Sequence, residues 1–420
     1  MVAERINNDI VIGLGFGDEG KGTIVDFLAT QQEPNYVVRF SGGAQAAHNV
    51  ITENNVHHTF SQFGSATFRG VKTILSDQMM VNPFNMAVEA NEIAEKIDRD
   101  PFELAYISSN ALMITPLHVA VNHLREVARG ASAHGSCGQG IGETRSYGIQ
   151  HPVLGIRISD LKNPGFLFTK LNIYREWAEK QFNVKLEAPS SEELMESYLD
   201  LLDDRPFNIV SNSFIYEELR KGYNIFEGSQ GILLDEKLGF HPNTTWSNTT
   251  AGNAQTLLKD SGLPKGNVIG VTRTYHTRHG YGPFPTEFDK AFDWSKKYPE
   301  NHNAYGRWQG DWRVGLLDLP LLSYGIQANH GVDEIALTHT DVEVTSVVDA
   351  YVQQKSPVPV FDGDMVRQEQ NITNKLLTAK THTKTINSFE ELKTIIVDDF
   401  KTPVTIESFG ARSDEKKFTA

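Results

Sequence analysis

A glycine-rich loop near the N-terminus carries the residue types that hold a phosphorylated ligand. It spans residues 15–23 and nearly fits the pattern GxxxxGK[ST], except that glycine occupies position 22, where serine or threonine is expected. Glycines let backbone N–H groups converge on an anion, and Lys21 can neutralise phosphate oxygens. The loop also carries two acids, Asp18 and Glu19, which suit a bridging Mg²⁺ or a general base. The alternative for this pattern is a strand-to-helix turn without a ligand.

Two further glycine-rich segments offer groups for catalysis or anion binding. His48 follows the segment 42–47 and could act as an acid or bind phosphate, or it could be structural. The loop 135–142 is rich in N–H groups and suits a second anion, with a mobile surface loop as the alternative. Cys137 within this loop has no evident activating cation, so it is a contact residue or a small filler.

Neutral polar runs and two arginines complete the set of candidate contacts. Segments 227–231 and 244–252 are dense in Ser, Thr, Asn and Gln, which can read base edges and sugar hydroxyls or form turns and helix caps. Segment 306–313 carries two arginines, whose planar forks grip carboxylates. Asp341 follows a predicted strand and could accept the N1 and N2 hydrogens of guanine.

The elements that position these residues indicate an α/β fold. A buried strand over 9–14, a helix over 23–29 and a strand over 36–40 are typical of a domain with a parallel sheet. Because repeated strands run into polar loops at their C-terminal ends, we expect one site along one edge of a single sheet. The further predicted elements are helices over 82–97 and 119–129, a charged helical stretch over 166–223, and strands over 224–226, 267–271 and 334–337.

Composition narrows the class of protein. The 420 residues are 39% hydrophobic and 22% charged, which is enough to bury a sizeable core. The formal net charge of -14 argues against nucleic acid or an anionic membrane as a partner, since both attract clustered cations. The single cysteine allows no internal disulfide and no thiolate cluster. A polar segment at residues 1–8 and the absence of a long apolar run lead us to expect a cytoplasmic protein.

Together and in this order, the polar segments resemble the adenylosuccinate synthetase family over nearly the whole chain. The resemblance is carried by Gly17-Asp18-Glu19-Gly20-Lys21-Gly22, by residues 226–235, and by the runs at 247–252 and 282–287. It implies one large α/β domain over residues 1–420, with a central, mostly parallel sheet flanked by helices and a P-loop-like phosphate loop. The stretch at about 166–223 would be a helical, charged insertion.

The family joins L-aspartate to C6 of IMP with GTP and Mg²⁺, through a 6-phosphoryl intermediate. The resemblance implies that Asp18 removes the N1 proton, that His48 is the acid, and that Gln230 contacts the purine. Asp18 and the backbone carbonyl of Ala47 would hold Mg²⁺, and Arg307 and Arg313 would bind aspartate. The implied nucleotide and phosphate contacts are Gly17, Glu19, Gly20, Lys21, Gly22, Gln45, Ala47, Cys137, Thr245, His339, Asp341, Ser408 and Gly410.

This chain departs from the family's pattern at several contacts. Cys137 replaces a threonine that contacts the monophosphate, and Gln139 replaces a nearby arginine. His339 replaces a lysine that packs on guanine, which leaves ATP open as the donor. The aspartate loop is about three residues longer and lacks its inner arginines. An arginine that the partner subunit lends in this family has no clear match, with Arg145 and Arg157 as candidates.

Three functions follow from these observations. The first is IMP–aspartate ligation by a homodimer that binds neither nucleic acid nor membrane. The second is the same chemistry on dGMP, as in a phage branch of the superfamily, with ATP as a possible donor. Retention of Asp18 counts against dGMP, because an exocyclic 2-amino group would crowd the carboxylate. The third is a nucleotide-binding regulator without ligase activity, in which Asp18, His48 and Gln230 would not be needed together.

Overall fold

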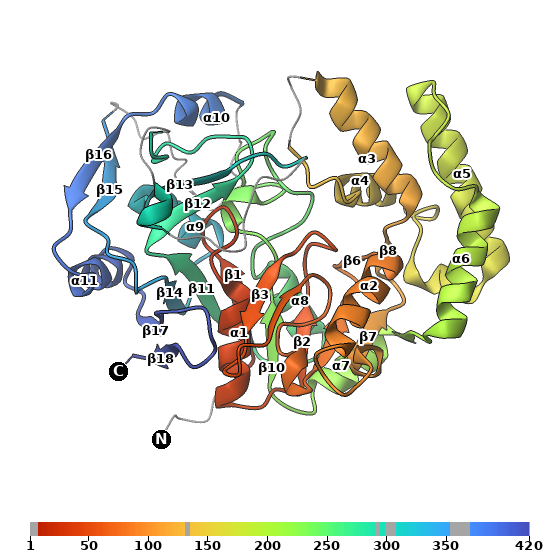
Figure 1. Ribbon diagram of the computed structural model, residues 1–420, viewed down its shortest axis with the longest axis horizontal. Coiled ribbons are helices and arrows are strands. Elements are labelled where there is room, and N and C mark those ends of the chain that lie inside the picture. The colour runs from red at the N-terminus through yellow and green to blue at the C-terminus, as the bar shows by residue number, and fades with distance from the viewer. Residues whose placement is uncertain (1–6, 131–134, 290–293, 299–307, 353–369, 420) are drawn as a thin grey trace.

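A ten-stranded sheet runs through the molecule (Figure 1). The computed structural model describes residues 7–130, 135–289, 294–298, 308–352 and 370–419. The strand order is β18-β17-β14-β11-β1-β10-β2-β5-β7-β9, and all neighbours are parallel except β17 and β18. The strands are β1 Asp9–Gly13, β2 Tyr36–Arg39, β5 Lys72–Leu75, β7 Ala105–Ser108, β9 Asn208–Val210, β10 Asn224–Glu227, β11 Asn267–Arg273, β14 Glu334–Thr338, β17 Val404–Ser408 and β18 Lys416–Phe418. The predicted α/β class with a mostly parallel sheet is confirmed.

Short strand pairs and helices surround this sheet. The pairs are β3 His48–Ile51 with β4 His57–Phe60, β6 Met80–Val81 with β8 Leu112–Met113, β12 Tyr275–His279 with β13 Trp312–Leu316, and β15 Ser346–Tyr351 with β16 Thr381–Thr385. The helices are α1 Lys21–Gln31, α2 Pro83–Ala94, α3 Pro116–Arg129, α4 Ile141–Gln150, α5 Pro164–Phe182, α6 Ser191–Asp204, α7 Asn212–Leu219, α8 Gly252–Asp260, α9 Leu319–Ala328, α10 Gln370–Leu377 and α11 Phe389–Phe400. None of the helices in the described ranges combines the length and apolar character needed to cross a membrane.

The elements expected from sequence are present, with one difference in the charged stretch 166–223. Helix α2 begins where the Asn-Pro pair predicts, and the Asn82 side chain caps it by accepting from the backbone N–H of Asn85 at 3.2 Å. The charged stretch forms α5, α6 and α7, but residues 208–210 return to the sheet as its edge strand β9. Three residues are too few to show a strand period in sequence, so only the pairing with β7 reveals this strand.

The central strands alternate their side chains between two cores. Ile10 and Ile12 of β1 are buried with residues of α7, α8, α9 and α11 on one face. Val11 points to the other face, where it packs with Ile24 and Val25 of α1. All five side chains are 0% exposed, and full burial of such a side chain contributes roughly 1.5–3 kcal/mol. Because both faces are covered, β1 reads as a continuous apolar run rather than an alternating one.

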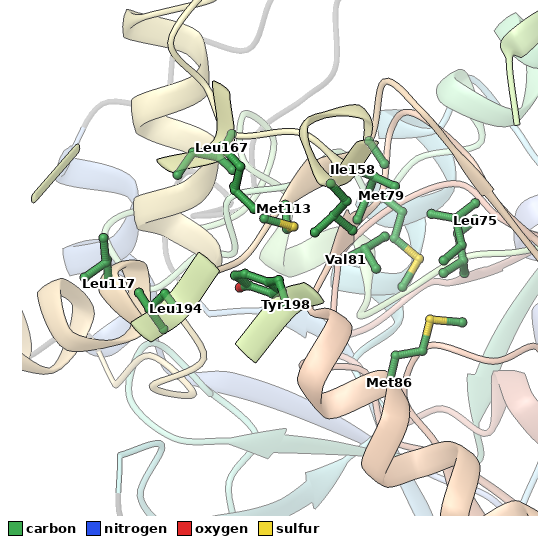
Figure 2. Close-up of a cluster of buried hydrophobic side chains, with 14 of the residues drawn as sticks. Leu75, Met79, Val81, Met86, Met113, Leu117, Ile158, Leu167, Leu194 and Tyr198 are labelled. Carbon is green, nitrogen blue, oxygen red and sulfur yellow. The ribbon is translucent and has the colours of Figure 1, made fainter. Parts of the chain in front are cut away.

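A third core lies beyond β5 and β7, under α2, α3, α5 and α6. Figure 2 shows Met79, Met86 and Met113 gathered there, with the ring of Tyr198 from α6. That ring stacks on Phe84 of α2 with 4.5 Å between centroids. This core fixes α3, whose C-terminal end leads toward the glycine-rich loop that precedes α4 (Figure 1).

Candidate active site

The sheet places the predicted polar loops around one cavity. Asp9 pairs with both Ile225 and Asn267 in parallel register, so β1, β10 and β11 end at the same edge of the sheet. A cavity of about 750 Å³ opens there. Residues predicted from sequence that line it are Gly17, Asp18, Gly20, Lys21, Gly22, Gln45, Ala47, His48, Cys137, Gln230, Thr245, His339, Asp341, Ser408 and Gly410. The polar residues predicted to lie along one edge of the sheet therefore surround one cavity.

The phosphate loop turns by means of left-handed backbone conformations. Gly17 and Gly20 have φ values of 94° and 97°, and Asp18 has a φ of 62° between them. Gly20 caps α1 without any side-chain hydrogen bond, which leaves the first N–H groups of the helix directed at the cavity. Lys21 is 3% exposed and lines the same space. This arrangement suits a phosphate group.

Glu19 has a different place from the one predicted. Its carboxylate turns under the loop and accepts from the backbone N–H of Gly15 at 3.0 Å and of Gly17 at 2.7 Å. The other oxygen pairs with Lys21 Nζ at 2.8 Å. A Cβ added to Gly13 would lie 2.3 Å from this carboxylate, so a glycine there makes its position possible. Glu19 thus shapes the loop and orients Lys21, rather than contacting the cavity.

Asp18 lies beside an arginine that sequence analysis missed. Arg273 Nε donates to the backbone carbonyl of Asp18 at 2.7 Å, and the guanidinium lies 5.5 Å from the ring centroids of Tyr275 and Trp312. Burial raises the pKa of the Asp18 carboxyl, while Lys21 and Arg273 act in the opposite direction. A carboxylate with a raised pKa is suited to accept a proton. Arg273 is the last residue of β11, two positions beyond the strand predicted over 267–271, and this nearness to a strand end was the available signal.

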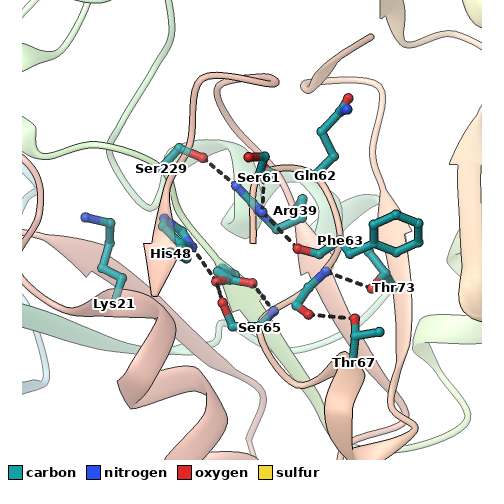
Figure 3. A network of polar contacts seen from close by, with 12 residues as sticks. Lys21, Arg39, His48, Ser61, Gln62, Phe63, Ser65, Thr67, Thr73 and Ser229 are labelled. Atoms are coloured by element: carbon teal, nitrogen blue, oxygen red, sulfur yellow. Dashed lines mark hydrogen bonds and ion pairs between the residues drawn. The ribbon is translucent and has the colours of Figure 1, made fainter. Parts of the chain in front are cut away.

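His48 is paired with an acid from another strand. Its Nδ1 lies 2.5 Å from Oε1 of Glu227, the last residue of β10 (Figure 3). The carboxylate also accepts from the backbone N–H of Ser65 at 3.0 Å and from the Ser65 hydroxyl. Burial favours a higher pKa for Glu227, but His48, Arg39 and the hydrogen bonds outweigh it and lower that pKa to about 2. In the sequence, Glu227 stands within the polar segment 227–231, where no spacing pattern assigns it a role.

Neutral side chains line the part of the cavity near α4. Both amide atoms of Gln45 are buried without a hydrogen-bond partner among the described residues, so this side chain can serve a ligand. Gln230 has a left-handed φ of 55°, and its Oε1 lies 3.4 Å from the Ser247 hydroxyl. Burial raises the pKa of the Cys137 thiol to about 11, which keeps it neutral. Thr245 donates its backbone N–H to Leu234 O at 2.7 Å, and this fixes its loop.

His339 and Asp341 line the opposite part of the cavity, beyond the phosphate loop. His339 has a φ of 58°, and its backbone carbonyl accepts from the Thr274 hydroxyl at 2.8 Å. Burial, with Arg273 and Lys416, lowers the pKa of His339 well below its ordinary value, so the ring is uncharged. Burial raises the pKa of Asp341. A neutral ring next to a carboxylate suits a planar base that carries hydrogen-bond donors.

Of the two arginines predicted to bind L-aspartate, Arg313 does not line the cavity. Arg313 pairs with Glu287 at 2.5 Å and donates to Gly280 O at 2.9 Å and Gly282 O at 3.0 Å, so it braces the β12–β13 hairpin. Arg307 lies outside the described residues. Both candidates for the arginine that the partner subunit lends in this family have contacts of their own. Arg145 lies 3.6 Å from Glu236, and Arg157 donates to the backbone carbonyl of Asn110 at 2.6 Å.

Two oxygen donors at the cavity, one from Asp18 and one from Ala47, suit a hard cation such as Mg²⁺. Within the described ranges, no group of three or more His, Cys, Asp or Glu side chains could hold a metal ion by itself. Asp18 and Ala47 both line the cavity, and they offer one carboxylate and one backbone carbonyl. Mg²⁺ is commonly bound by one or two carboxylates, with phosphate oxygens and water completing an octahedron. The residues present therefore fit a Mg²⁺ that arrives with a nucleotide.

Comparisons with known proteins place the chain in a family. The family described as Adenylosuccinate synthetase matches residues 10–407. The adenylosuccinate synthetase of Thermoplasma volcanium is 35% identical over 338 residues, which cover 79% of this chain and 75% of the relative. The adenylosuccinate synthetase of Chlorobium limicola is 32% identical over 436 residues, which cover 97% of this chain and 96% of the relative.

Two solved structures share the fold. Fully ligated adenylosuccinate synthetase from Plasmodium falciparum superimposes with a TM-score of 0.81 at 22% identity, covering 99% of this chain and 100% of that chain. Succinoaminodeoxyadenylate synthetase of cyanophage S-2L, bound to dGMP and dATP, gives a TM-score of 0.61 at 16% identity. The superposition covers 99% of this chain and 96% of that chain. At these identities the likeness concerns the fold alone.

Proposed function

Because the chain belongs to the adenylosuccinate synthetase family of ligases, we propose that it joins L-aspartate to C6 of IMP, with GTP as phosphoryl donor and adenylosuccinate, GDP and phosphate as products. The observation that carries this proposal is the presence of Asp18, His48 and Gln230 around the same cavity as the phosphate loop. A protein that only binds a nucleotide needs a phosphate loop, but it does not need a base and an acid beside it.

In the first half-reaction, Asp18 accepts the N1 proton of hypoxanthine, and the negative charge moves to O6. O6 then attacks the γ-phosphorus of GTP, the bond between that phosphorus and the β–γ bridging oxygen breaks, and GDP leaves. The raised pKa of Asp18 supports its role as the base. The αL backbone of Asp18, braced by Arg273, supports a fixed position for the carboxylate.

Charge on the transferring group must be stabilised without solvent. Lys21, the N-terminal amides of α1 and His48 are the groups that we assign to this task. Asp18 and the Ala47 carbonyl would hold Mg²⁺, which when bound neutralises phosphate charge. Glu19 keeps Lys21 oriented through its 2.8 Å ion pair.

In the second half-reaction, the aspartate amine attacks C6, the C6–O bond breaks, and phosphate leaves with the bonding electrons. The proton that the amine loses passes to the departing phosphate. Gln230 holds the purine during both steps. Arg307 remains our prediction for a substrate carboxylate, whereas the contacts of Arg313 with Glu287 and two carbonyls favour a structural role. We also propose a homodimer, in which a partner arginine completes the monophosphate site.

A second candidate uses dGMP as acceptor, with ATP as a possible donor. It is motivated by the neutral Cys137 and His339 at positions where the family carries other residues, and by the fold shared with the cyanophage enzyme. A coupled phosphate-release assay with IMP and dGMP, each with GTP and with ATP, separates the two. Turnover with dGMP alone would overturn the proposal, and phosphate release that ignores added L-aspartate would favour a nucleotide-binding regulator.

A further inference from the structure

We propose that Glu227 is the positioning residue that holds His48 in its Nδ1–H tautomer and thereby presents Nε2 to the phosphoryl group in transfer. The inference rests on the proposed function, because it assigns His48 to the donor phosphates. It adds to the site a residue outside the cavity wall, since Glu227 lies behind the histidine and does not line the cavity.

The contact geometry leaves one arrangement of protons. Glu227 is 0% exposed, and its Oε1 lies 2.5 Å from His48 Nδ1. The same oxygen accepts from the Ser65 hydroxyl, and Oε2 accepts from the Ser65 backbone N–H at 3.0 Å. An ionised carboxylate only accepts, so the ring nitrogen that faces it must carry the proton. Nε2 is then the nitrogen that can exchange a proton with a ligand.

The charges around the pair keep the acid ionised. Arg39 is the direct neighbour of Glu227 across β2 and β10, and it is 0% exposed. Lys21 faces His48 from α1. Arg39 and Lys21 are the two cations that act on the histidine, and Glu227 is the anion that opposes them. Burial lowers the pKa of His48, and these cations add to that effect while Glu227 raises it.

A purely structural role would look different. Glu89 is a buried carboxylate of the same region, and it accepts from the backbone N–H groups of Ser61, Gln62 and Phe63. These three donors are backbone groups of the segment 61–63, which Glu89 braces. Glu227 instead directs one oxygen at a side chain that lines the cavity. In the view of Figure 3, His48 lies between Lys21 and Ser65, whose hydroxyl donates to the same carboxylate.

The test replaces the acceptor by a donor of the same shape. In Glu227→Gln the amide NH₂ can face His48, which forces Nδ1 to accept and moves the proton to Nε2. We expect kcat for aspartate-dependent phosphate release to fall about 10²- to 10⁴-fold, with nucleotide KM changed less than about threefold. Glu227→Asp keeps an acceptor and should recover at least about tenfold of that loss. Glu89→Gln, the matched control, should lower stability and leave kcat within about threefold.

A second readout does not depend on turnover. Nitrogen-15 NMR of histidine-labelled protein, with the His48 signal assigned by its loss in His48→Asn, reports which ring nitrogen bears the proton. We expect Nδ1–H in the wild type and Nε2–H in Glu227→Gln. Nε2–H in the wild type, or a Glu227→Gln variant with kcat within about threefold of wild type, would overturn the inference. A wild type that lacks aspartate-dependent turnover would overturn the proposed function, while the NMR result would still decide the role of Glu227.

Discussion

A Cβ added to Gly22 would lie 2.6 Å from the Cβ of His48. The same atom would lie 2.9 Å from the Ser65 hydroxyl. Real Cβ atoms do not approach so closely, so the glycine at this position is a steric requirement of the histidine. The hydroxyl that usually follows the lysine of a phosphate loop is absent because the catalytic candidate, held by Glu227, fills its place. The imperfect motif is thus a consequence of a second functional group.

Restoring the hydroxyl should damage the site. We expect Gly22→Ser to displace His48 and to lower kcat/KM at least about 100-fold, although the protein still folds. Steady-state kinetics and circular dichroism measure the two effects. Gly165→Ser is the control, because a Cβ there meets only the Asn163 side chain, at 3.9 Å. Wild-type activity in Gly22→Ser would contradict the steric account.

Loss of the proposed base should abolish turnover without unfolding the protein. For Asp18→Ala we expect at least about a 10³-fold loss in kcat, with nucleotide binding retained in calorimetry. In the wild type, Asp18 must be ionised to accept a proton. Because burial raises its pKa, kcat should fall on the acid side at a pH above that of an ordinary aspartate. Substantial activity of Asp18→Ala would remove Asp18 from this role.

The proposed preference for GTP should depend on Asp341. Its carboxylate can accept two hydrogens from a guanine edge, whereas an Asn side chain offers one acceptor and one donor. We expect Asp341→Asn to raise KM for GTP at least about tenfold and to change KM for ATP little. Asp414→Asn, an exposed residue paired with Arg412, is the control. An unchanged ratio of kcat/KM for GTP and ATP would argue against this contact.

One buried acid away from the cavity should set part of the pH dependence of stability. Asp318 caps α9 by accepting from Leu321 N at 3.0 Å and is 2.5 Å from the Tyr351 hydroxyl. Burial raises its pKa from 3.8 to about 7. The folded state therefore holds this proton more tightly than the unfolded chain, and the stability it contributes at low pH is lost as pH rises from about 4 to about 7.

In Asp318→Asn this dependence of stability on pH should disappear. An amide keeps the acceptor for Leu321 N and can donate to Tyr351, so we expect the variant to gain roughly 2–4 kcal/mol relative to wild type between pH 4 and 7.5. Urea unfolding at several pH values measures the difference. Asp398→Asn, an exposed position on α11, controls for the loss of one charge. Parallel stability curves for wild type and Asp318→Asn would show that the carboxyl titrates normally.

Features that depend on neighbours along the chain can be read from the amino-acid order alone. The glycine pattern of the phosphate loop, the apolar run of β1 and the Asn-Pro start of α2 are local, because turn conformations, strand periods and helix caps involve residues a few positions apart. Polar loops at the ends of parallel strands were enough to predict a site at one edge of the sheet.

Which polar groups face one another follows from the folding of distant segments. Glu227 and His48 are 179 positions apart, and Arg273 and Asp18 are 255 apart, so no spacing rule could have joined them. The same holds for Arg313, a predicted substrate contact whose guanidinium pairs with Glu287. Glu19 differs, because it is close in sequence to its partners but turns inward only since Gly13 leaves room. Partner choice depends on packing, and packing is a property of the assembled sheet.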